Sequence, residues 1–275
     1  MRGASRASYS GLRERLTVAA SGAATAGTAG TAGKVGDELF AVVRLLDSEH
    51  GLRRALADQT KPPAEKAAVV GQLLRGKVSA ATEKLVTEAV SARWATPGDL
   101  SDAIEQLAIE AFTLAAQFGG TLDDLEDDLF RFGRLVSAQP GLRLALVGSA
   151  ATDAKASLLA SLLDGKVSAV SLSLIEAVLT HPRGRSPQAV LDLCASIAAR
   201  RREQLVAVIR VATELSAAQR QRLGEALASA YGQGIHLNIV HDPEVVGGVS
   251  VQIGDELVDG TVTSRLAEVR RKLAS

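Results

Sequence analysis

A segment of about ninety residues occurs twice in this chain, and it strongly limits the folds that the first three quarters of the sequence can adopt. Random similarity between Ala-rich helices would give scattered matches, whereas these matches are collinear. The blocks are DELFAVVRLL from Asp37 with DDLFRFGRLV from Asp127, GLRRAL from Gly51 with GLRLAL from Gly141, and GKVSA from Gly76 with the same five letters from Gly165. We therefore expect a duplicated helical unit.

Composition and the positions of capping and helix-breaking residues also predict helices in this part of the chain. Hydrophobic residues make up 47% of the sequence and aromatic residues 3%, which is typical of an Ala-, Leu- and Val-rich helical protein with tight packing. We expect eleven helices before Arg202, the first of them from Ser5 to Ala20. Pro63 should open a helix, while Asp99 and Thr121 are expected to act as N-caps.

The expected fold is mainly α, with two tandem helical-bundle units and a small α/β domain at the C-terminal end. The first unit covers residues 1–100 and the second covers residues 101–203. The helix from Asp99 to Phe118 closes the first unit and opens the second. The α/β domain covers residues 204–275.

A Gly-, Ala- and Thr-rich run from Ser21 to Gly36 precedes the first repeat. It ends in GTAGTAGK, which invites comparison with a phosphate-binding loop. Thr28 stands where that loop needs its first Gly, Val35 follows the Lys where Ser or Thr is required, and no predicted strand precedes the run. We expect a flexible connector here.

The last part of the chain has the alternation of strands. Gln204 to Ala212 is apolar on both faces, which predicts a central strand. Ser216 and Gln219 form a capping-box pattern for a helix that should end at Gly232. Two alternating strands follow, in which the apolar members are Ile235, Leu237 and Ile239, and then Val249, Val251 and Ile253. A helix with Val262, Leu266, Val269 and Leu273 on one stripe closes the chain.

This C-terminal stretch resembles the signature of the ATP synthase delta subunit family, which includes the mitochondrial oligomycin-sensitivity-conferring protein. The order is Asp-Pro, an apolar pair, Gly-Gly, an alternating strand, Gly-Asp, Asp-Gly with a hydroxyl residue, and Arg-Leu. The matching residues are Asp242, Pro243, Gly247, Gly248, Gly254, Asp255, Asp259, Gly260, Arg265 and Leu266, with Thr261 where Ser is usual. The duplicated bundle departs from the usual single copy and is similar to long actinobacterial forms.

The resemblance implies a peripheral-stalk, or stator, component of F-type ATP synthase, without cofactor or catalytic site. The bundle would receive the N-terminal helix of an alpha subunit, and the α/β domain would receive the C-terminus of the b subunit. One copy per complex would lie on the cytoplasmic side of the cell membrane. Apolar residues that could line partner grooves, or could instead be core, are Leu39, Val43, Leu85, Val86, Leu129, Phe132, Leu174, Ile175, Leu266, Val269 and Leu273.

The residues that could take part in catalysis or metal binding are isolated in the sequence, and they do not form a catalytic constellation. We expect Cys194 and Trp94 in the core, and His236 and His241 about 16 Å apart on opposite strand faces, too far to share a metal. The carboxylates at Asp123, Asp124, Glu126, Asp127 and Asp128 suit the first turns of a helix, although a metal or docking site remains an alternative. Arg200 to Arg202 could face an acidic partner or simply solvent.

Charge balance and length limit the classes of function. Lys and Arg together number 31, as do Asp and Glu, so a nucleic-acid partner is not expected. No apolar run reaches the length of a membrane span. The alternative to the stator is a helical-repeat adaptor unrelated to ATP synthase, which would explain the repeat but not the C-terminal signature. A nucleotide-binding enzyme is disfavoured because Gly247 and Gly248 precede a strand instead of a helix.

Overall fold

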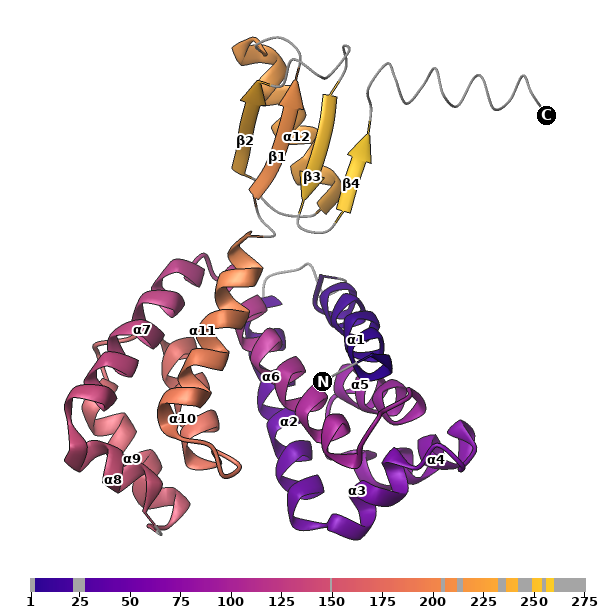
Figure 1. Ribbon diagram of the computed structural model, residues 1–275, viewed down its shortest axis with the longest axis vertical. Helices are drawn as coiled ribbons and strands as arrows, with labels where there is room; N and C mark the ends of the chain where they lie inside the picture. The colour runs from indigo at the N-terminus through magenta and orange to yellow at the C-terminus, as the bar shows by residue number, and fades with distance from the viewer. Residues whose placement is uncertain are drawn as a thin grey trace. The chain divides into compact units, whose positions relative to one another are not determined.

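Figure 1 shows a computed structural model of the chain. The structure describes residues 3–21, 28–148, 150–203, 206–211, 215–231, 236–241, 249–253 and 256–259. They belong to two compact units, Met1–Ala198 and Ala199–Ser275. Helices make up most of the described residues, which confirms the mainly α fold class.

The expected eleven helices before the first strand are present among the described residues. Their bounds are α1 (Ala4–Ser21), α2 (Thr28–Ser48), α3 (His50–Ala57), α4 (Pro63–Leu74), α5 (Ala80–Ser91), α6 (Pro97–Phe118), α7 (Leu122–Ala138), α8 (Pro140–Val147), α9 (Thr152–Leu163), α10 (Ala169–Thr180) and α11 (Pro187–Glu203). The remaining helix, α12 (Ala217–Tyr231), lies in the second unit.

The succession α2 to α6 has a counterpart in α7 to α11. α3 and α8 both have 8 residues, and α4, α5, α9 and α10 all have 12. Ser79 and Ser168 cap α5 and α10 with the same φ of −65° and ψ of 155°. Each serine N–H also donates to a carboxylate from the first helix of its repeat, Glu38 at 3.0 Å and Asp128 at 3.1 Å. The repeat in the sequence is thus accompanied by a repeat of local geometry.

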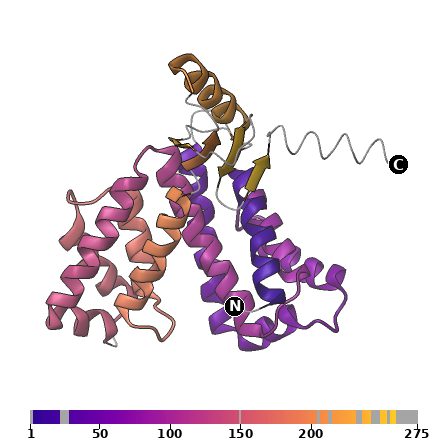
Figure 2. The same cartoon turned by 45° about the horizontal axis from the view of Figure 1, so that its top comes forward.

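The long helix α6 lies at the centre of the compact unit Met1–Ala198, which is called the first unit from here on. It contacts α1, α2, α3 and α5 on one side and α7 and α10 on the other, so helices of both repeats surround it. Nearly every residue from Leu100 to Ala116 is buried. Figures 1 and 2 show α7 to α10 grouped on one side of α6 and α1 to α5 on the other. A helix with apolar residues on most of its circumference suits such a central position.

The expectation of a flexible connector from Ser21 to Gly36 is wrong from Thr28 onward, where α2 begins. Ala32 and Val35 are buried, and Gly36 packs against Phe112 of α6. A Cβ atom on Gly36 would lie only 2.6 Å from the Phe112 ring. The small residues that suggested flexibility instead permit close approach of two helices, a need that composition alone does not reveal. Residues 22–27 lie outside the described part.

Helix starts agree with the sequence at some caps and differ at others. Pro63 is the first residue of α4, as expected. Asp99, however, is not the N-cap of α6, because the Thr96 hydroxyl accepts from the Asp99 N–H at 3.2 Å and Pro97 is the first helical residue. Thr121 occupies the cap position of α7, but its side chain makes no capping hydrogen bond. Its hydroxyl donates to the Ala116 carbonyl instead.

The second unit contains a four-stranded sheet with the order β2-β1-β3-β4. The strands are β1 (Val206–Val211), β2 (His236–His241), β3 (Val249–Ile253) and β4 (Glu256–Asp259). β1 pairs in parallel with β2 and antiparallel with β3, so it has the central place that its apolar character predicted. β4 was not predicted, since the sequence around Gly254 and Asp259 suggested turns only. It extends the sheet by pairing antiparallel with β3.

One face of this sheet packs against α12. Ile209, Val211 and Val251 form the buried cluster, with Leu223 and Leu227 of the helix against it. The capping box is confirmed, because the Ser216 N–H donates to Gln219 Oε1 at 2.8 Å and the Gln219 N–H donates to Ser216 Oγ at 3.3 Å. The predicted C-terminal helix and the connector at 242–248 lie outside the described residues.

Candidate functional site at the junction of the helical repeats

The apolar residues that could have lined partner grooves are buried in the chain itself. The eight that fall in described helices, none more than 3% exposed, are Leu39, Val43, Leu85, Val86, Leu129, Phe132, Leu174 and Ile175. A core-facing stripe and a docking stripe have the same i, i+3, i+4 spacing, so the pattern cannot separate them. The structure buries these eight, and two of them, Val43 and Leu129, also line clefts. Their role as partner contacts stays a prediction. Leu266, Val269 and Leu273 lie outside the described residues.

The family signature falls mostly outside the described part as well. Of its residues only Asp259 is described, and it ends β4 opposite Ser250 of β3. The other nine signature residues are not placed, so their expected roles stay predictions. The strands that flank them, β2 and β3, are where the alternation predicted.

A cluster of charged residues that sequence reasoning missed joins the two repeats. It is centred on the loop between α10 and α11, where Arg183 has a φ of +54° and Gly184 a φ of +75°. This left-handed turn is rare for a residue with a side chain. It places the Arg183 guanidinium against α2 and α6, which belong to the first repeat.

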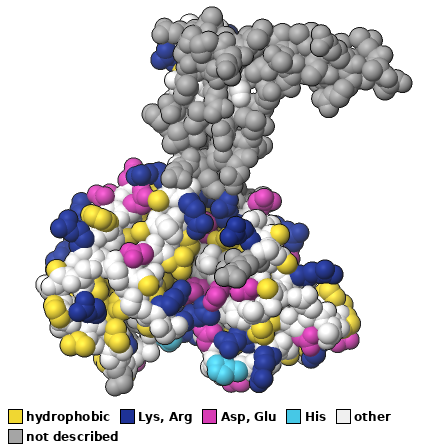
Figure 3. Space-filling model, viewed as in Figure 1, with side chains coloured by type: hydrophobic (Ala, Val, Ile, Leu, Met, Phe, Trp, Pro, Cys, Tyr) yellow, Lys and Arg dark blue, Asp and Glu magenta, His cyan; other side chains and the backbone are white. Residues whose placement is uncertain are grey.

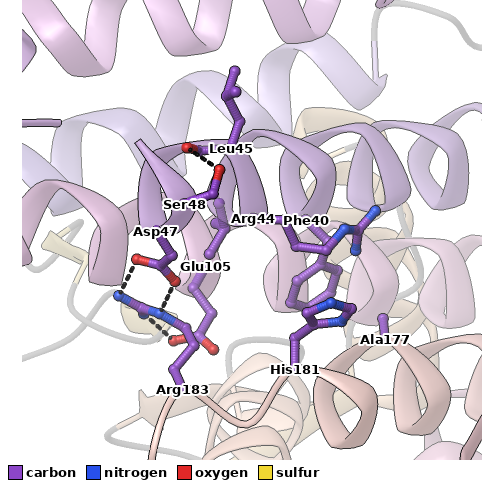
Figure 4. Close-up of a pocket in the computed structure, with 10 residues that line it drawn as sticks. Phe40, Arg44, Leu45, Asp47, Ser48, Glu105, Ala177, His181 and Arg183 are labelled. Atoms are coloured by element: carbon purple, nitrogen blue, oxygen red, sulfur yellow. Dashed lines mark hydrogen bonds and ion pairs between the residues drawn. The ribbon is translucent and has the colours of Figure 1, made fainter. Parts of the chain in front are cut away.

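The hydrogen bonds in this cluster form a connected network, shown in part in Figure 4. Arg183 Nε donates to Asp47 Oδ2 at 2.6 Å. Arg183 Nη1 donates to Asp102 Oδ1 at 2.9 Å and to Glu105 Oε2 at 2.8 Å. Arg185 donates to the other oxygen of Glu105. Both oxygens of this carboxylate, whose side chain is only 3% exposed, are therefore paired.

The carboxylates of this network keep the Arg183 guanidinium charged. Burial alone would lower the pKa of Arg183, but the carboxylates around it, with Glu105 the strongest, raise that pKa above its ordinary value. A buried carboxylate with two guanidinium partners is stable as an ion, whereas the same group without them would be costly. The arrangement suits a structural joint, because its guanidinium and carboxylate groups are paired with one another.

A cleft of about 540 Å³ lies beside the network, between α2, α6 and α10. Phe40 and Val43 line one wall, and Ala177 and His181 face them from the second repeat (Figure 4). Burial first, and then the positive charges of Arg44 and Lys155, lower the pKa of His181 below its usual value. The ring is therefore neutral at pH 7, and it lies next to the Thr180 hydroxyl at 3.2 Å.

The signal that could have revealed this junction is a local departure from the repeat. Asp47 and Glu105 of the first copy correspond, ninety residues on, to Ser137 and Ala195 of the second. Charged residues present in one copy alone indicate a contact that one copy alone makes. The loop residues Arg183 and Arg185 supply the opposite charges, but their pairing over 136 and 80 residues of sequence is not a local pattern.

The other residues singled out in the sequence, as far as they are named here, have positions that suit a structural role. Cys194 is fully buried, and burial raises the pKa of its thiol far above the usual range. Trp94 is 1% exposed and donates from Nε1 to the Ala89 carbonyl at 2.7 Å. Asp123 and Asp124 lie in the first turn of α7, as expected. Within the described ranges, no group of three or more His, Cys, Asp or Glu residues is placed to hold a metal ion.

Comparison with known proteins gives consistent matches. The family model "ATP synthase delta (OSCP) subunit" matches residues 109–273. "ATP synthase subunit delta" of Streptomyces avermitilis is 46% identical over 274 residues, which is 99% of this chain and 98% of that protein. The protein of the same name from Thermobifida fusca is 47% identical over 241 residues, or 87% and 90% of the two chains. The family match begins within α6, so the first copy of the repeat, apart from the second half of α6, lies outside it.

Among solved structures, a chain of the Toxoplasma gondii mitochondrial ATP synthase hexamer is similar to 61% of this chain and 95% of its own length. The TM-score is 0.32 and the sequence identity 16%, so this likeness is too low to bear on the fold.

Proposed function

The chain belongs to the ATP synthase delta (OSCP) subunit family, and from this premise we propose that it is the joint between the catalytic head and the peripheral stalk of an F-type ATP synthase. The family match over residues 109–273, together with 46% identity to subunit delta along the whole chain, carries this conclusion. The protein would resist rotor torque, so that proton flow drives ATP synthesis instead of turning the head. Its own contribution would be mechanical, without bond-making chemistry.

A torque-resisting joint needs stiffness between its parts, and the junction of the repeats supports that role. Arg183 bridges α2 and α6 through three carboxylates and comes from the loop that precedes α11. Arg183 and Glu105 are paired and largely buried, so they have little freedom to exchange each other for water. The first unit would therefore transmit force as one body.

Two contacts follow from the family. We place the N-terminal helix of the alpha subunit on the helical unit and the C-terminus of the b subunit on the α/β unit, with Leu266, Val269 and Leu273 as candidate contacts. Deleting the chain from Gln204 onward should abolish binding of a peptide from the C-terminus of b and leave binding of a peptide from the N-terminus of alpha intact. Calorimetric titration of both peptides into both chains measures this. Retained b binding in the truncated chain would refute the assignment of the α/β unit.

The duplicated helical unit extends this scheme. We propose that residues 1–100 and 101–203 are tandem bundles, and that the additional one gives a second contact to the catalytic head. The matching helix lengths and capping serines of the two copies support this view. Titration with the cognate alpha N-terminal peptide should then reach a stoichiometry near two. A stoichiometry near one would show that a single copy binds alpha.

The expected subcellular location follows from membership of the same family. We expect one copy per synthase, peripheral to the membrane sector, on the cytoplasmic side of the cell membrane. Within the part of the chain that the structure describes, helices are too short or too polar to cross a bilayer. The attachment to the membrane would thus come through the b subunit.

A further inference from the structure

The cleft at the repeat junction has two ends that differ in charge. Its volume of about 540 Å³ falls within the range of small-molecule pockets, roughly 300–1,000 Å³. At one end the carboxylates of Asp47 and Glu105 are paired with Arg183, so these charges balance each other. Figure 3 shows acidic and basic side chains next to each other along the seam between the lobe of α1 to α5 and the lobe of α7 to α11. A ligand would find the charges at this end already paired.

Arg44 lies at the other end of the cleft, together with Phe40 and His181 (Figure 4). Arg44 is exposed, and within the described part of the chain its side chain has no hydrogen bond or ion pair. Its charge acts on Asp37, two turns earlier in α2, but burial outweighs this effect and keeps the pKa of Asp37 above its usual value. The guanidinium of Arg44 is therefore free to bind an anion from outside the chain.

A second cation near this end is Lys155 of α9, which is 8% exposed. Lysine is rarely buried without an acidic partner. In the first repeat the equivalent Lys66 is attracted by Asp58, the residue that follows α3. Gly148 follows α8 in the second repeat, so this carboxylate is missing there. Among the described residues, none forms a hydrogen bond or ion pair with the side chain of Lys155.

His181 is close enough to both cations to be affected by their charge, because Arg44 and Lys155 lower its pKa in addition to burial. Among the described residues, no carboxylate contributes to this shift, so the electrostatic potential at this end of the cleft is positive. The side chains of Phe40 and Val43, which are 4% and 3% exposed, form an apolar wall of the same cleft. A positive potential beside an apolar wall suits a molecule that has both an anionic and an apolar part.

We propose that this end of the cleft binds a small amphiphilic anion, with its carboxylate or phosphate group at Arg44 and its apolar part against Phe40 and Val43. A guanidinium can hold either group through two parallel hydrogen bonds. The bound molecule would contact α2 of the first repeat and α10 of the second, and would thereby stiffen the junction between them. This binding site goes beyond the stator function, and it can be tested on the isolated chain.

The first test is calorimetric titration of the full-length chain with octanoate, octyl phosphate and octanol, three probes with the same apolar chain and different head groups. We expect a dissociation constant of roughly 0.1–1 mM for the anion that fits better. Octanol should bind at least about tenfold more weakly, because it cannot form a charge-assisted hydrogen bond with Arg44. Acetate should also bind at least about tenfold more weakly, because it lacks the apolar chain.

These titrations also separate the two head groups. Tighter binding of octanoate would indicate a carboxylate ligand, and tighter binding of octyl phosphate would indicate a phosphate ester. Equal binding of octanol and the two anions would overturn the proposal, as would the absence of binding by either anion. Neither of these results would bear on assembly of the synthase, so the stator function would stand.

The second test changes the arginine at the site. Arg44→Gln should weaken binding of the anion by about tenfold and leave binding of octanol unchanged. Arg54→Gln is the matched control, because Arg54 is also an exposed arginine of the first repeat but does not line the cleft. Unchanged anion affinity in Arg44→Gln would refute the site. Thermal unfolding by circular dichroism checks the fold of both variants, and the comparison of octanoate with octanol in the unaltered chain needs no variant.

The pH dependence of octanoate binding gives a further check on the location. A bound anion offsets the positive charges of Arg44 and Lys155, so it favours the protonated ring of His181. The pKa of His181 is then higher in the bound chain than in the free chain, and the affinity should rise as pH falls from about 8 to about 6. The carboxylate of octanoate stays ionised over this range. His181→Gln should remove the rise, and a rise of the same size in this variant would contradict the proposal.

Discussion

Glu38 shows how a single carboxylate can organise one copy of the repeat. It accepts hydrogen bonds from the Ser79 N–H at 3.0 Å, from Ser79 Oγ at 2.6 Å and from Thr82 Oγ1 at 2.6 Å. Burial acts to raise the pKa of Glu38, but these hydrogen bonds outweigh it and lower the pKa below its usual value. The ionised form thus ties α2 to the start of α5.

Glu38→Gln should therefore destabilise the chain by about 1–2 kcal/mol at pH 7, since an amide cannot accept all these donors. The lowered pKa means that Glu38 contributes stability above its unfolded pKa, near 4.5, and that this contribution is lost as pH falls through the folded pKa. Urea unfolding at pH 7 and in acid should show the gap between the two chains closing in acid. Asp128→Asn is the control: among the described contacts Asp128 accepts one hydrogen bond, from Ser168, so its effect should be smaller.

At the scale of elements, α2 and α6 form the closest helix pair of the first unit. Their contact depends on small residues one turn apart in α2. A Cβ on Gly36 would meet the Phe112 ring at 2.6 Å, whereas a Cβ on Gly33 would meet Ala115 at an ordinary 4.0 Å. Both glycines are helical, so the backbone preference for Ala is the same at each position.

Gly36→Ala should therefore destabilise the chain by about 1–2 kcal/mol, as the clash exceeds the gain in helix propensity. Gly33→Ala should stabilise it by about 0.5–1 kcal/mol. Thermal unfolding of both variants measures the difference. A stabilised Gly36→Ala variant would mean that α2 and α6 do not pack as closely as described.

At the scale of the whole molecule, the Arg183 network couples the two repeats. Arg183→Met would leave Glu105 buried with Arg185 as its remaining partner, and we expect a loss of about 2–3 kcal/mol in the free energy of unfolding. Arg53→Met is the control, because Arg53 pairs with the same Asp47 at 3.0 Å but within one repeat and at a more exposed site. Its cost should stay below about 1 kcal/mol. Urea unfolding of both variants decides whether the junction matters more than a local pair.

The two compact units predict an independent behaviour of the helical part. A chain that ends after Glu203 should keep its helical circular dichroism and the thermal midpoint of the first unit, because that unit has its own core. Loss of cooperative unfolding in this shorter chain would show instead that the α/β unit stabilises the helices.

Local patterns in the sequence were sufficient for most of the elements, although they missed β4 and the start of α2. The helices of both repeats, the central strand β1 and the capping box of Ser216 and Gln219 follow from spacing over a few residues, and the structure confirms them. The family signature needed no tertiary information either. Caps and periodicity act between residues at most four apart, and such short-range effects are encoded directly in the chain.

Only the tertiary structure decided what those elements pack against. The start of α2 at Thr28 depends on α6, and the pairing of Arg183 with Asp47 spans 136 residues. Phe40 and Phe130 occupy equivalent places in the repeat, yet the first packs against Phe112 of α6 and the second is exposed. Burial depends on which distant segments of the chain pack against a residue, and similar local sequences do not determine those contacts.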